Sequence, residues 1–118
     1  MTSLKKLQKD IHDLAVKKGW YEKPRSALEI HALIHSEISE ATECCRRGDP
    51  DYFTDISEDG SVKPEGEAIE LADTVIRIMD YFESKGWNLE EFIKTKHEYN
   101  KTRSHRHGGK WHEMSIMW

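Results

Sequence analysis

The segment from residue 66 to residue 82, GEAIELADTVIRIMDYF, constrains the fold more than any other part of the chain. On a helix, its apolar side chains fill about half of the circumference, which is wider than the roughly 100° stripe of an ordinary surface helix. They are Ile69, Leu71, Ala72, Val75, Ile76, Ile78, Met79 and Phe82. We therefore expect a central helix that packs on more than one side. Because short helices of one subunit cannot cover so wide a face, we also expect a homodimer or homotetramer.

The rest of this helix carries charged side chains with helical spacing, at Glu70, Asp73, Arg77 and Asp80. Residues three or four apart on a helix are neighbours. Two carboxylates one turn apart on a rigid helix can hold a divalent cation. The alternative is a solvated charged face on which Arg77 pairs with its neighbours.

A second acidic pair lies upstream, in a predicted helix over residues 26–47. Glu37 falls inside the apolar arc of that helix, and Glu40 lies at its edge one turn later. An ionised carboxylate facing a core must be neutralised, paired with a base or bound to a metal. Neither helix offers a basic residue placed to pair with Glu37. The two pairs therefore predict a Mg²⁺ site, with Mn²⁺ as an alternative ion, formed by Glu37, Glu40, Glu70 and Asp73.

Composition bounds the class of protein. The chain has 118 residues, of which 36% are hydrophobic and 34% charged, and this length suits one domain. A mean hydropathy of −0.81 and the absence of a long apolar run argue against a membrane span. The start, MTSLKKLQKD, lacks the apolar core of a signal peptide, so we expect a cytoplasmic protein. The only two cysteines, Cys44 and Cys45, are adjacent, which predicts reduced thiols.

Periodicity and capping residues predict four helices, over residues 3–17, 26–47, 64–86 and 88–103. Residues 51–64 show no helical period and are expected to form a mobile loop, and no strand is predicted. The fold class is therefore all-α, with a helical domain at residues 1–104 and a basic, aromatic tail at 105–118. Trp20, in the first connection, is either a core plug or a flat surface for a base.

The remaining sequence features give less support to other metal sites, other catalytic mechanisms or nucleic-acid binding. His31 and His35 lie one turn apart, but far around the helix from Glu37, so they cannot serve the acidic site. No phosphate-binding loop, serine elbow or zinc-protease motif is present, which leaves metal-assisted chemistry as the enzymatic option. The histidines and basic residues of the tail could instead contact nucleic acid, although the net charge of −4 disfavours this.

Three segments resemble the MazG-like, all-α nucleoside triphosphate pyrophosphohydrolases: LIHSEISEA, EAIELADTVIRIMDY and KHEYNKTRSHRHGGK. The resemblance implies a four-helix MazG-like bundle that assembles as an oligomer. It also implies that the two acidic pairs bind magnesium. The sequence departs from the family's motif at one position. The first acid of the motif, here Glu37, is often preceded by another acid, but this chain has Ser36 there.

The resemblance also implies which residues contact the substrate. Lys96, Asn100 and Arg103 would reach the phosphates. Trp20 would lie beside the base, and His12 faces that region in some relatives. Apart from the resemblance, the two glycines before Lys110 predict that this residue can close over a bound triphosphate.

The predicted reaction is hydrolysis of a (deoxy)nucleoside triphosphate to the monophosphate and pyrophosphate. Glu37 or Glu40 would accept the proton of the attacking water. Within this class, a dCTP- or dUTP-specific pyrophosphatase is an alternative, and an enzyme acting on phosphoribosyl-ATP is a weaker one. Outside it, the alternative is a non-catalytic helical interaction protein or a nucleic-acid-binding protein.

Overall fold

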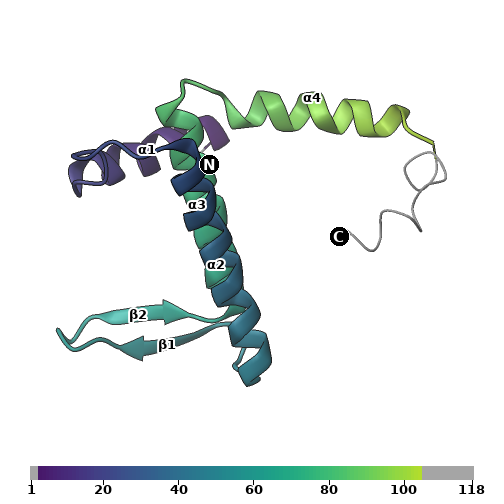
Figure 1. Cartoon of the computed structure of the whole chain (residues 1–118). Coiled ribbons are helices and arrows are strands. Elements are labelled where there is room, and N and C mark those ends of the chain that lie inside the picture. Colours follow the sequence, from purple (N-terminus) through teal and green to yellow (C-terminus); the bar gives the residue numbers. More distant parts are fainter. Residues whose placement is uncertain (1–2, 105–118) are drawn as a thin grey trace. The chain divides into compact units, whose positions relative to one another are not determined.

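The computed structural model describes residues 3–104, which form four helices and one two-stranded sheet (Figure 1). In chain order the elements are α1 (Leu4–Lys17), α2 (Ala27–Arg47), β1 (Phe53–Ile56), β2 (Val62–Glu65), α3 (Glu67–Ser84) and α4 (Leu89–Thr102). The chain divides after Trp87 into two compact units. The predicted all-α class is confirmed only in its coarser form, because the described residues are mainly helical but also form a small sheet. None of the described helices is long and apolar enough to cross a membrane.

The helix boundaries follow the capping residues of the sequence. Side-chain oxygens of Ser3, Ser26 and Asn88 each accept a hydrogen bond from the backbone N–H three residues later. These bonds satisfy donors that have no partner within the helix. Gly48, in the left-handed conformation, ends α2. The four predicted helices are therefore confirmed.

In the first unit, α3 packs against both α2 and α1. The buried apolar side chains are few, namely Ala41, Cys44 and Met79. Gln8 of α1 is also buried, and its amide donates hydrogen bonds to Glu83 Oε1 (2.9 Å) and to the Trp87 carbonyl (2.7 Å). This polar contact holds α1 against the end of α3.

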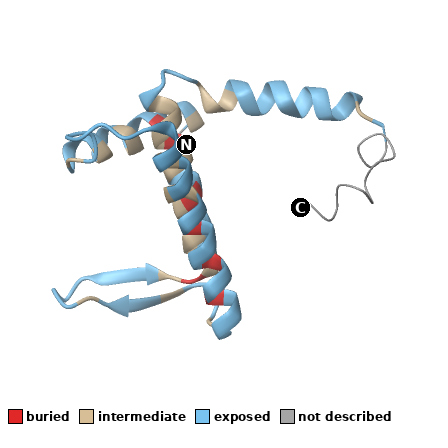
Figure 2. Ribbon diagram, in the orientation of Figure 1, coloured by how far each residue is buried: buried red, intermediate tan, exposed pale blue. Residues whose placement is uncertain are grey.

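Part of the apolar face of α3 remains exposed. Figure 2 shows that buried positions lie along the paired helices of the first unit, among intermediate and exposed ones. Leu71, Val75 and Ile76 are between 43% and 48% exposed. The expectation that α3 packs on more than one side is confirmed, but α1 and α2 do not cover the whole face. Cys44 is buried and Cys45 exposed, and both are free thiols as predicted.

Residues 51–64 were expected to form a loop without strands, and that prediction is wrong. Phe53–Ile56 and Val62–Glu65 form an antiparallel hairpin in which Phe53 pairs with Glu65 and Ile56 with Val62. Figure 1 shows it extending from the region where α2 ends and α3 begins. Pro64 lies in β2 instead of opening the helix, which begins at Glu67. A proline is tolerated there because this two-stranded sheet has only edge strands.

Gly66 joins the hairpin to α3 and is buried. Its φ of 114° is one that residues with a Cβ rarely adopt, and a Cβ here would meet the backbone of Asp51. The backbone N–H of Ala68 donates to the Asp51 carbonyl at 3.1 Å. The start of α3 is therefore held against the segment that follows α2.

The second unit contains α4, whose residues are mostly exposed. Within it, the Lys96 ammonium lies 4.7 Å from the centroid of the Tyr99 ring, and the Arg103 guanidinium lies 5.8 Å from it. The predicted tail at 105–118, which includes Lys110, lies outside the described residues.

Candidate metal centre and adjoining pockets

The packing of α2 against α3 brings together three of the four predicted metal ligands. One carboxylate oxygen from each of Glu37, Glu70 and Asp73 lies within 4.8 Å of the others. Glu37 is buried because it faces α3, whereas Glu70 and Asp73 follow each other by one helical turn. Hard oxygen ligands of this kind suit Mg²⁺, which binds them at about 2.1 Å. The donor set therefore has the chemistry that Mg²⁺ prefers, and binding one ion would require the carboxylates to move closer together and Glu37 to leave Arg77.

The fourth predicted ligand, Glu40, is exposed on α2. Burial, the neighbouring carboxyl group of Glu40 and the charges of Asp73 and Glu37 raise the pKa of Glu70 from 4.5 to about 7. Without a cation, Glu70 therefore keeps its proton to a higher pH than an ordinary glutamate does.

Neighbouring groups shift the pKa of Asp73 in opposite directions. Burial and the charge of Glu37 raise its pKa, while the guanidinium of Arg77 lowers it. The net shift is upward. The cluster is therefore crowded with negative charge that its surroundings compensate only in part.

The sequence predicted no basic partner for Glu37, and this is wrong. Arg77 Nε donates to Glu37 Oε1 at 2.7 Å, and the two side chains are 28% and 9% exposed. Arg77 lies one turn after Asp73 on α3, so it reaches the same side of the cluster. It provides the opposite charge that a buried carboxylate requires.

The hairpin contributes a further cation that sequence reasoning missed. Lys63 of β2 forms an ion pair with Glu65 at 3.2 Å, which raises its pKa, and the charges of Glu70 and Glu40 raise it further. These four residues line a hollow of about 300 Å³ beside the acids. Nothing in the sequence indicated this position because the hairpin itself was not predicted.

A pocket of about 320 Å³ adjoins the acids on the side of α1. Its wall combines an apolar surface with the three carboxylates of Glu37, Asp73 and Asp80. The apolar surface comes from Ile11, Leu14, Ala15, Trp20 and Ile76, and the two flanking cations are Lys18 and Arg77. A ligand in this pocket can therefore contact apolar groups at one end and acidic groups at the other.

Trp20 is 37% exposed, so the core-plug interpretation is wrong. Its ring lies under two guanidinium groups, Arg25 at 4.3 Å and Arg77 at 4.9 Å from the ring centroid. It lines the pocket beside α1 and also a second pocket. Trp20 can present a ring face to a base only where these arginines leave room.

His12 joins a network beside both pockets. Its Nδ1 lies 2.8 Å from Asp80 Oδ1, and the Tyr21 hydroxyl donates to Asp80 Oδ2 at 2.8 Å. The His12 and Tyr21 rings also meet edge to face at 4.8 Å. Burial and the nearby carboxylate raise the pKa of Tyr21 to about 12, which keeps this hydroxyl a donor. His12 thus positions Asp80, a role that its sequence context did not suggest.

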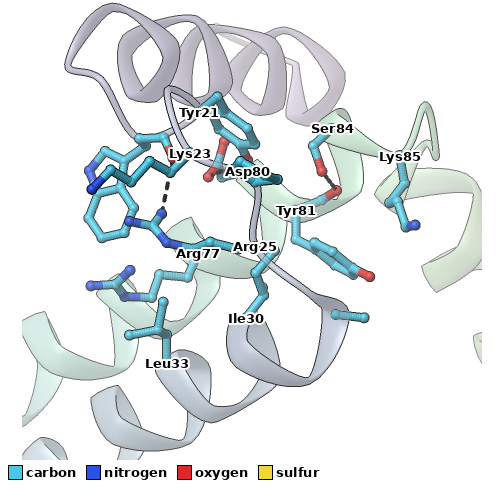
Figure 3. Close-up of a pocket in the computed structure, with 13 residues that line it drawn as sticks. Tyr21, Lys23, Arg25, Ile30, Leu33, Arg77, Asp80, Tyr81, Ser84 and Lys85 are labelled. Atoms are coloured by element: carbon cyan, nitrogen blue, oxygen red, sulfur yellow. Dashed lines mark hydrogen bonds between the residues drawn. The ribbon is translucent and has the colours of Figure 1, made fainter.

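The second pocket, of about 300 Å³, is drawn in Figure 3. Trp20, Arg77 and Asp80 line it together with the pocket beside α1, so they form the wall between the two. Its remaining charged side chains are basic. They are Lys23, Arg25 and Lys85.

The predicted phosphate ligands belong to the other compact unit. Lys96, Asn100 and Arg103 all come from α4 or its end. That unit is described by itself. Their role, like that of Lys110, stays a prediction.

Comparison of the chain with protein-family models, with curated proteins and with solved structures finds no match in any of the three.

Proposed function

We propose that Glu37, Glu40, Glu70 and Asp73 bind magnesium, and that the protein hydrolyses nucleoside triphosphates to monophosphates and pyrophosphate. The observation that carries the proposal is the approach of three carboxylates from two helices within 4.8 Å. Three carboxylates this close repel one another, although only Glu37 is buried and Arg77 offsets part of the cost, and a bound cation would offset more of it. The resemblance of the two acidic motifs to MazG-like enzymes supplies the reaction type.

The pocket beside α1 supports a nucleotide as substrate. Its apolar wall suits a base or sugar, while Glu37 and Asp73 lie where the metal-bearing phosphates would be held. Magnesium, when bound, neutralises phosphate oxygens and lowers the pKa of a water. Lys18 lines the same pocket and would attract the anionic substrate.

The protein's own acids would then move a proton. Glu37 or Glu40 would accept it as the water oxygen forms a bond to the α phosphorus. The bond between the α phosphorus and the bridging oxygen breaks, and pyrophosphate leaves with that oxygen. Lys63, near Glu40 and Glu70, would offset part of the charge that gathers there.

The test is pyrophosphate release from a panel of ribo- and deoxynucleoside triphosphates, with Mg²⁺ or Mn²⁺. Glu37→Gln and Asp73→Asn should reduce turnover by at least about a hundredfold and abolish magnesium binding measured by calorimetry. Glu58→Gln, at an exposed acid of the hairpin loop, is the matched control and should leave both unchanged. A folded protein that releases no pyrophosphate from any nucleotide would refute the proposal.

We also propose that the enzyme is a homo-oligomer that completes a MazG-like helical bundle. The support is the exposed apolar face of α3, at Leu71, Val75 and Ile76, together with the small core of the first unit. The same face favours the alternative of a non-catalytic helical interaction protein. The nucleotide panel separates the two, because that alternative predicts no turnover.

A further inference from the structure

The pocket shown in Figure 3 carries an excess of positive charge. Four basic side chains line it, and the single acidic one is Asp80. The basic side chains are Lys23, Arg25, Arg77 and Lys85. The protein as a whole has a net charge of −4, so the excess of positive charge in this pocket is opposite in sign to the charge of the whole chain.

The one acid of the pocket offsets only one of these four positive charges, and within residues 3–104 it forms no ion pair with any of the four basic side chains. Both oxygens of Asp80 are already engaged, one with His12 Nδ1 and one with the Tyr21 hydroxyl, each at 2.8 Å. Arg77 is engaged too, because its Nε donates to Glu37. Within residues 3–104, Lys23 and Arg25 form no ion pair.

Arg25 is held in place without an acidic partner. Its Nη1 donates to the Trp20 carbonyl at 3.1 Å, and its guanidinium lies 4.3 Å from the Trp20 ring centroid. Neither contact neutralises the charge. A guanidinium has five donors in a planar fork, and one such bond leaves most of them for a ligand.

The cations are not spread evenly around the pocket. Figure 3 shows Lys23, Arg25 and Arg77 on one side of the hollow, whereas Lys85 lies apart from them, beyond Ser84. The Lys85 ammonium instead lies 5.8 Å from the centroids of the Tyr81 and Trp87 rings. The side occupied by Lys23 and Arg25 is therefore where an anion would bind.

We propose that this pocket binds a phosphate-bearing anion through Lys23 and Arg25. Paired phosphate oxygens match the planar guanidinium fork, and a flexible lysine adds a mobile charge. The ligand is free pyrophosphate or the phosphate group of a nucleotide, which share this chemistry. The site goes beyond the proposed function, since it uses none of the four acids and needs no metal.

The experiment titrates the full-length, metal-free protein with inorganic pyrophosphate by calorimetry, at constant ionic strength. Lys23→Gln combined with Arg25→Gln should weaken binding roughly tenfold or more, since a charge-assisted hydrogen bond contributes more than about 1.4 kcal/mol. The matched control is Lys5→Gln with Lys17→Gln, which removes the same charge from exposed positions of α1. It should change the dissociation constant less than about twofold.

The double variant also removes the contacts of Arg25 with Trp20, which could disturb the connection between α1 and α2. Lys23→Glu, which leaves Arg25 in place, is therefore tested as a separate variant. It should weaken pyrophosphate binding more than Lys5→Glu does. Three further arms use inorganic phosphate, a nucleoside monophosphate and its unphosphorylated nucleoside. Binding of the monophosphate more tightly than inorganic phosphate identifies a nucleotide as the source, and equal binding identifies the free anion.

Three results would overturn the proposal. One is the absence of pyrophosphate binding at millimolar concentration. Another is an equal loss in the pocket variant and the α1 control, which would indicate diffuse attraction only. The third is binding of the bare nucleoside as tightly as the monophosphate. Because no metal is present, none of these results bears on the acidic cluster, which the magnesium titration tests separately.

Discussion

Replacing Arg77 with methionine tests how the acidic cluster is balanced without a metal. The change removes the donor that lies 2.7 Å from Glu37 Oε1 but keeps an apolar stem of similar length. Breaking a fully buried ion pair from one side costs about 3–5 kcal/mol. Here Glu37 is 9% exposed but Arg77 is 28% exposed, so water can replace part of the lost bond. The lost contact with the Trp20 ring adds roughly 0.5–1 kcal/mol. We expect Arg77→Met to lower the free energy of unfolding by about 2–3 kcal/mol in metal-free buffer.

Magnesium should reverse much of this loss. An ion bound at Glu37 supplies the positive charge that Arg77 supplied, and in the variant it no longer has to displace the guanidinium. We therefore expect magnesium to bind about tenfold more tightly to Arg77→Met, which corresponds to about 1.4 kcal/mol. The destabilisation measured with saturating magnesium should be correspondingly smaller.

Urea unfolding followed by far-ultraviolet circular dichroism, with and without magnesium, measures the stability effect, and calorimetry measures the affinity. Arg46→Met is the matched control, because Arg46 is exposed on α2 and forms no ion pair in the described part of the chain. The decisive comparison places Arg77→Met in a Glu37→Gln background. If the arginine change costs as much there as in the native protein, its contribution comes from Trp20 and the explanation through Glu37 is refuted.

Three other outcomes follow from the structure. Because the pKa of Glu70 is raised from 4.5 to about 7, the folded protein keeps a proton that the unfolded chain releases, so metal-free stability should fall as pH rises between these values. After allowance for solvent screening, the loss is roughly 1–2 kcal/mol; thermal melts should show it in the native protein and not in Glu70→Gln. Gly66→Ala should destabilise by roughly 2 kcal/mol or more, because its φ is strained and its Cβ meets backbone. Gly48→Ala, where nothing lies within 4 Å, should cost about half as much by chemical denaturation. Replacing Leu71 and Val75 with glutamates should give a monomer by light scattering if the native protein is an oligomer, and a monomeric native protein would contradict the proposed assembly.

The helices could be predicted from sequence because their signals are local. Ser3, Ser26 and Asn88 each cap a helix through a bond to the third residue onward, and this needs no tertiary information. The acidic cluster was also predictable, since burial of Glu37 followed from the apolar arc around it. A helical wheel shows which side chains of one helix share a face.

What could not be predicted depends on how two elements meet. A wheel does not show which side chain of α3 reaches Glu37, and Arg77 lies 40 positions later in the chain. The hairpin was missed for another reason. The strands FTDI and VKPE are short and mostly exposed, so they lack the alternation that burial of one face imposes. Pro64 also fits the first turn of a helix, so the predicted helix began there, whereas a two-stranded hairpin has no central strand for a proline to disturb.

The distribution of charge also distinguishes the two pockets from an ordinary solvated surface. On α1, charges pair within the helix, as Lys6 does with Asp10 and Lys9 with Asp13, and such exposed pairs contribute little. On α3 the cluster acids Glu70 and Asp73 precede Arg77, whereas the pocket shown in Figure 3 adds two cations, Lys23 and Arg25, that form no ion pair within residues 3–104. Arg77 is the one described residue that lines both pockets and forms an ion pair with the cluster. Acidic and basic side chains that lie near each other without forming ion pairs still produce an electrostatic potential in each pocket. Only ion pairing would cancel that potential. The separation of these charges is what a site for a cation and a site for an anion require.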